Sequence, residues 1–96
     1  MKASLIFYHK DFIANRYVVE LVIYEVMDIK SYPDKIKYGL ICKDLTTGAF
    51  VLMDNHFPKG PHVHINQHEA TYVYINNDRL IEDFKKLVWE ELGVKL

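Results

Sequence analysis

The sequence predicts an α+β fold, in which about five antiparallel strands form a meander and one C-terminal helix packs on a face of the sheet. Aromatic residues make up 14% of the 96 residues, with 7 Tyr and 5 Phe, a composition that favours strands. Apolar runs separated by turn residues fill most of the chain before residue 76. Residues 78–92 repeat their apolar positions with a helical period instead. A small barrel-like closure of the same strands is the alternative.

The composition is that of one small folded domain, residues 1–96. Hydrophobic residues make up 50% and charged residues 26%, which excludes disorder as the main state. The net charge of −1 argues against nucleic-acid binding through bulk positive charge, but it leaves room for a local basic patch. The single cysteine, Cys42, excludes an intramolecular disulfide and is expected to be a buried, inert thiol. Because no apolar run reaches the ~18–20 residues that span a bilayer, and no secretory signal is recognised, we expect a cytoplasmic protein without membrane contact.

Strands are predicted over residues 2–13, 17–27, 36–45, 49–53 and 70–75, with residues 62–65 extended between the last two. Residues 17–27 are mostly apolar on both alternating faces, so this strand is expected to be central in the sheet. Pro33 and Asp34 mark a loop, since proline lacks an N–H and aspartate bonds its local backbone. Residues 46–48, Thr-Thr-Gly, mark a tight hairpin. Residues 54–61 hold a glycine and two prolines and are expected to be irregular.

The helix is predicted over residues 78–92, after a cluster of capping residues at 76–78. Its apolar stripe consists of Leu80, Ile81, Phe84, Leu87, Val88 and Leu92. Gly93 follows as a stop signal. A helix with one apolar stripe buries it by lying across a face of the sheet.

Three of the five histidines fall within nine residues, and this loop is the most site-like feature of the sequence. If residues 62–65 are extended, period two places His62 and His64 on one face. In metal-free RNA cleavage one imidazole takes the 2′-OH proton while the other protonates the leaving oxygen. Lys59 would offset negative charge on the phosphorane, and Asp54 would orient an imidazole. The competing interpretation is a pair of exposed imidazoles on an edge strand.

A metal site is a second interpretation of the same histidines. His62, His64 and Glu69 follow the spacing H-x-H-x4-E, which resembles the first metal motif of the cupins. The flanking glycines of that motif are missing, and its second half would fall where the helix is predicted, so a true cupin is discounted. A simpler site built from His56, His62, His64 and Glu69 would take a divalent transition metal. The acid–base interpretation needs no cofactor.

Asp54-Asn55-His56 followed by Pro58-Lys59-Gly60-Pro61-His62-Val63-His64 resembles the D-N…K-G-x-H-x-H segment of the TumE-type toxins of type II toxin–antitoxin systems. The likeness extends over nearly the whole chain, which has a similar length, order of strands and C-terminal helix. It implies a prokaryotic cytoplasmic protein that is paired with a small helix-turn-helix antitoxin and acts on translation, with RNA as the expected target. The matching positions are Asp54, Asn55, Lys59, Gly60, His62 and His64.

The candidate catalytic residues are therefore His62, His64, Lys59 and Asp54, and the candidate binding residues are Asn55, Gly60 and His56. A third interpretation makes the domain a non-catalytic protein-interaction module. Because an open sheet exposes its edge strands, a homodimer formed by strand pairing is also expected to be possible.

Overall fold

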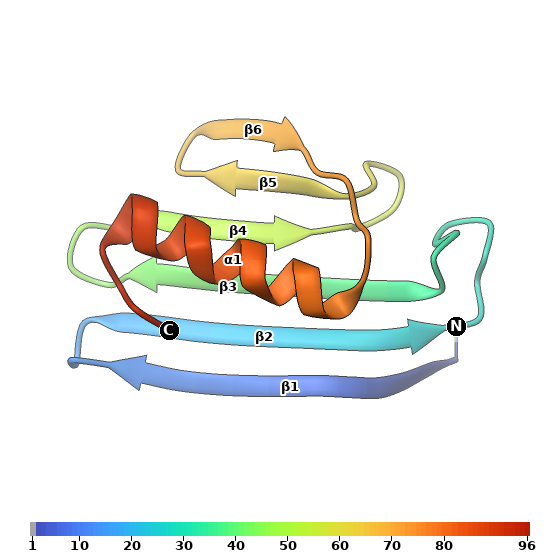
Figure 1. Cartoon of the computed structure of the whole chain (residues 1–96), viewed down its shortest axis with the longest axis horizontal. Helices are drawn as coiled ribbons and strands as arrows, with labels where there is room; N and C mark the ends of the chain where they lie inside the picture. The colour runs from blue at the N-terminus through green and yellow to red at the C-terminus, as the bar shows by residue number, and fades with distance from the viewer. Residues whose placement is uncertain (1) are drawn as a thin grey trace.

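A computed structural model describes residues 2–96 as an antiparallel meander of six strands followed by one helix (Figure 1). The strands are β1 (Ala3–Ile13), β2 (Tyr17–Val26), β3 (Ile36–Asp44), β4 (Phe50–Asp54), β5 (His62–Ile65) and β6 (His68–Thr71), and the helix is α1 (Asn77–Leu92). Each strand pairs with the next, so their order in the sheet is their order in the sequence. The predicted α+β class is confirmed.

The prediction of about five strands was slightly low, because the extended residues 62–65 are a full strand. The last strand also begins earlier than predicted, at His68 rather than residue 70, and ends at Thr71. Asn66 explains the earlier start, since it adopts a positive φ of 55° and makes a two-residue turn out of residues 66 and 67. Within residues 2–96 no pairing joins β1 to β6, so the sheet is open rather than barrel-like.

The core lies between one face of the sheet and α1. Side chains on alternate positions of β2, β3 and β4 form it, including Leu21, Leu40 and Met53, which are cross-strand neighbours in one row. Leu80, Phe84 and Val88 are the fully buried residues of α1, as the 3.6-residue period predicts. Cys42 is buried in this core, as expected, and burial raises the pKa of its thiol to about 11.

The helix ends are capped as the sequence predicts. Asn76 is the N-cap, and its Oδ1 accepts a hydrogen bond from the Arg79 N–H at 2.8 Å. Gly93 has a left-handed φ of 68°, and its N–H donates to the Trp89 carbonyl at 3.0 Å. The helix contacts β3 and β4 and leaves β1 uncovered (Figure 1). This one helix in the described part of the chain is not long and apolar enough to cross a membrane.

The turns at one end of the sheet are tied together by an ion pair. Arg16, in the β1–β2 turn, donates to both oxygens of the buried Asp44 carboxylate, from Nε at 3.1 Å and from Nη2 at 2.7 Å. The Thr46 N–H donates to the same carboxylate at 2.9 Å. These contacts, the Arg16 guanidinium first, hold the pKa of Asp44 well below its usual range.

Candidate functional site

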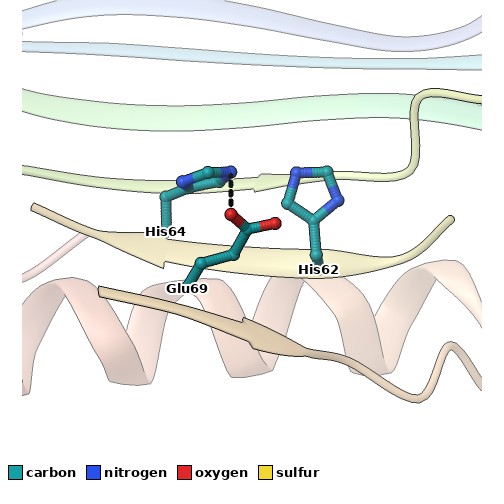
Figure 2. A group of neighbouring side chains, drawn as sticks. All are labelled: His62, His64 and Glu69. Atoms are coloured by element: carbon teal, nitrogen blue, oxygen red, sulfur yellow. Dashed lines mark ion pairs between the residues drawn. The ribbon is translucent and has the colours of Figure 1, made fainter. Parts of the chain in front are cut away.

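His62 and His64 lie side by side on β5, as the period of two predicts (Figure 2). Between them, Val63 points into the core beneath α1, so both imidazoles face the side of the sheet that the helix does not cover. Their ring centroids are 4.8 Å apart and the rings meet edge to face. The carboxylate of Glu69, from β6, lies between them in the same view.

His62 is buried and both of its ring nitrogens face oxygen acceptors. Nδ1 lies 2.7 Å from the carbonyl oxygen of Gly60, and Nε2 lies 3.1 Å from Oδ1 of Asp54, its cross-strand partner on β4. Since a carbonyl only accepts, Nδ1 carries the proton and donates it to Gly60. A positive φ of 75° at Gly60 brings that carbonyl into position. Asp54 and Gly60 therefore hold His62 in one orientation, with Nε2 directed at the carboxylate.

His64 is more accessible than His62 and contacts a charged pair. Its Nε2 lies 3.8 Å from Oε2 of Glu69, which is its cross-strand partner on β6. The other carboxylate oxygen, Oε1, lies 2.5 Å from Nζ of Lys59, which comes from the β4–β5 loop and so reaches across β5. The Lys59 ammonium, with smaller contributions from His64 and His62, lowers the pKa of Glu69. Glu69 is therefore ionised at neutral pH.

A shallow groove of about 440 Å³ runs beside this cluster along the β4–β5 loop. Asp54, His56, Phe57, Pro58, Lys59 and His62 line it. Phe57 leaves about half of its side chain exposed, and Lys59 is exposed to a similar degree. A flat aromatic ring, a cation and a buried His–Asp pair thus share one surface. Phe57 was not a candidate by sequence. The pattern that could have indicated it is an apolar residue next to Pro58 in an otherwise polar loop.

Asn55 lies next to Asp54 but contributes to the sheet instead of to the groove. Its side chain is buried, with Oδ1 accepting from the Tyr38 N–H at 2.9 Å and Nδ2 donating to the Ile36 carbonyl at 2.7 Å. The amide therefore continues the β3 ladder past the end of β4, as a backbone peptide group would. The buried Asn55 side chain therefore has a structural role in the sheet, and its expected binding role stays a prediction.

The sequence candidates for a metal site are only partly brought together. The donor atoms of His62, His64 and Glu69 all lie within 4.8 Å of one another. His56, the fourth ligand expected from the sequence, is exposed in the loop and lies outside this group. The three-residue group suits a divalent transition metal by its donor types. It is wider than a closed site, since metal–ligand bonds of about 2.0–2.2 Å require donors about 3–3.5 Å apart.

Comparison with known proteins adds no relative. The chain matches no family model, and neither the curated proteins nor the solved structures give a match to it.

Proposed function

We propose that this protein acts on RNA as the toxin of a type II toxin–antitoxin pair, cleaving it at the histidine cluster. The observation that carries the proposal is the pair of imidazoles 4.8 Å apart on an uncovered sheet face, beside a groove with Lys59 and Phe57. Proton transfer at two positions needs two such groups. The loop cation suits a phosphate, and the exposed ring suits a stacked base.

The chemistry follows from the roles that the surroundings allow. In RNA cleavage the 2′-oxygen attacks the adjacent phosphorus and the P–O5′ bond breaks, leaving a 2′,3′-cyclic phosphate and a 5′-hydroxyl. One imidazole accepts the 2′-OH proton while the second donates a proton to O5′. Asp54 fixes the orientation of His62, whose Nε2 must leave Asp54 to transfer a proton because Nδ1 is bound to the Gly60 carbonyl. Glu69 stabilises positive charge on His64. Lys59 offsets the charge on the phosphorane.

The test is cleavage of RNA by the purified, tag-free protein in excess EDTA. Because each acid–base group contributes about 10²–10⁴ to a rate, His64→Ala is expected to lower the cleavage rate by that factor. His68→Ala is the matched control, since His68 is an exposed histidine of the same hairpin that lies outside the cluster. Cleavage by wild type and control but not by His64→Ala supports the proposal. Equal rates in all three proteins contradict it.

Induced expression in a bacterial host tests the toxin assignment separately. We expect wild type and His68→Ala to arrest growth, and His62→Ala or His64→Ala to leave it normal at equal protein levels. Co-expression with the product of the neighbouring gene, expected to be a small helix-turn-helix protein, restores growth and gives a complex that purifies together. Growth arrest by both His62→Ala and His64→Ala would show that the toxic activity does not need these histidines.

A divalent transition-metal site is the second candidate, favoured by one specific contact. The Gly60 carbonyl takes the Nδ1 proton of His62, so Nε2, which lies 3.1 Å from Asp54, is the nitrogen that would turn to the metal, the arrangement usual for metal-bound histidines. Binding would require Glu69 to turn from Lys59 toward the imidazoles. Stoichiometric zinc uptake by the tag-free protein, lost in Glu69→Gln and kept in His68→Ala, would support this function. If RNA cleavage requires that metal, His62 and His64 act as metal ligands and not as the acid and base of the reaction.

A further inference from the structure

The strand β1 is a long, exposed edge strand of the sheet. Ten of its eleven residues are exposed, and it pairs on one side only, with β2. The other edge strand, β6, has four residues and carries His68 and Glu69. Natural edges are kept short, bulged or charged because a free row of N–H and C=O groups pairs with other strands. β1 has one irregularity, between Leu5 and Phe7, and is otherwise long, regular and largely apolar.

We propose that β1 pairs antiparallel with β1 of a second copy of this chain, which joins the two sheets into one continuous sheet. Both faces of the strand are apolar enough for this. Tyr8 and Phe12 lie on the uncovered face with 53% and 60% of their surface exposed, and Phe7 lies on the helix side with 39% exposed. A partner strand would cover the flanks of all three side chains.

Symmetry limits the registers that such a pair can adopt. A two-fold axis that joins two antiparallel edges stands perpendicular to the sheet, so residues opposite each other lie on the same face. One residue must then lie directly opposite its own copy across the axis. The candidates for this central residue near the middle of the strand are His9, Lys10 and Asp11. Each choice places a different set of side chains in contact.

Charge selects Lys10 as the centre. His9 and Asp11 lie on the helix-side face, opposite Leu21 and Val19 of β2, so neither meets a charge across its own sheet. Neither forms an ion pair in the part of the chain that the structure describes. A two-fold axis at Lys10 places His9 of each copy opposite Asp11 of the other, which gives two complementary pairs. An axis at Asp11 would instead place two carboxylates opposite each other.

The same register suits the remaining residues of the strand. It places Tyr8 opposite Phe12 of the second copy on the uncovered face, and Phe7 opposite Ile13 on the helix side. The two Lys10 side chains meet at the axis, and each has Glu20 of its own chain as its cross-strand neighbour on β2. Each lysine therefore has a glutamate of its own sheet on its other side, which offsets part of the repulsion between the two ammonium groups.

Light scattering during gel filtration measures the first consequence. Wild type is expected to elute at twice the chain mass of 11.3 kDa at tens of micromolar protein. Phe12→Glu leaves the fold intact because the side chain is exposed, and it is expected to raise the dimer dissociation constant about tenfold or more. The double variant Tyr8→Lys/Phe12→Glu restores the dimer, since each lysine then lies opposite a glutamate of the other copy. A wild-type monomer overturns the proposal.

Cysteine cross-linking measures the register. Lys10→Cys places two thiols opposite each other with their Cα atoms about 4.5–5.5 Å apart, within the range of a disulfide. Phe12→Cys is the control, because its two copies would be more than about 13 Å apart along the strands. The native Cys42 is buried and is expected to stay unreacted, and wild type without the added cysteine controls for it. Oxidation that cross-links Lys10→Cys but not Phe12→Cys supports the register, and the reverse result overturns it.

Discussion

Replacing Asn55 by alanine is expected to destabilise the fold, although the residue was a binding candidate by sequence. The change leaves the Tyr38 N–H and the Ile36 carbonyl without the partners that lie 2.9 and 2.7 Å away in the native protein. An unsatisfied buried group costs about 1–3 kcal/mol. Two groups lose their partner, and Ile36 and Asn55 keep 9% and 7% of their surface exposed to solvent, which offsets part of the cost. We therefore expect Asn55→Ala to lower the free energy of unfolding by about 2–4 kcal/mol. For a domain of this size that lowers the midpoint of thermal unfolding by roughly 10–25 °C.

Urea and thermal unfolding measure this effect, with Gln67→Ala as the control because Gln67 is exposed in the β5–β6 turn. The control is expected to stay within about 0.5 kcal/mol of wild type. Asn55→Asp separates the two hydrogen bonds, since it keeps the acceptor for Tyr38 and loses the donor to Ile36. An Asn55→Ala protein as stable as the control would refute the structural role and return Asn55 to the binding candidates.

Three further predictions concern the core and the ion pair. The contacts that lower the pKa of Asp44 stabilise the fold at a pH above the unfolded pKa of about 4, and this stabilisation is lost as the pH falls below that value. In urea titrations, Arg16→Gln is therefore expected to show a smaller loss of unfolding free energy between about pH 4 and pH 2 than wild type. An equally steep fall in that variant would exclude the pair as its source. Phe84→Ala leaves a cavity between α1 and the sheet and is expected to cost about 3–5 kcal/mol of unfolding free energy; a loss under about 1 kcal/mol would mean that α1 does not depend on this contact. Cys42, with a pKa of about 11, is expected to react with thiol reagents only in denaturant, and fast modification of the native protein would show that the core opens readily.

The sequence by itself determined the fold class, the helix and most strand positions. Alternation over residues 17–27 and the helical stripe around Phe84 are local patterns, and the capping residues Asn76 and Gly93 act on the backbone beside them. It also determined that His62 and His64 share a face, because a strand alternates its side chains wherever it lies in a sheet.

Only the tertiary structure decided what surrounds those histidines. Glu69 meets His64 because the turn at residues 66–67 sets the register of β6, and Lys59 meets Glu69 because the loop carries it across β5. Asn55 continues the hydrogen-bond ladder of β3, with partners 17 and 19 residues away in the sequence. Such contacts depend on strand register and loop path, and a change of one residue in either moves a side chain to the other face or out of reach. Local sequence patterns do not specify the strand register or the loop path, so the sequence by itself does not determine these contacts.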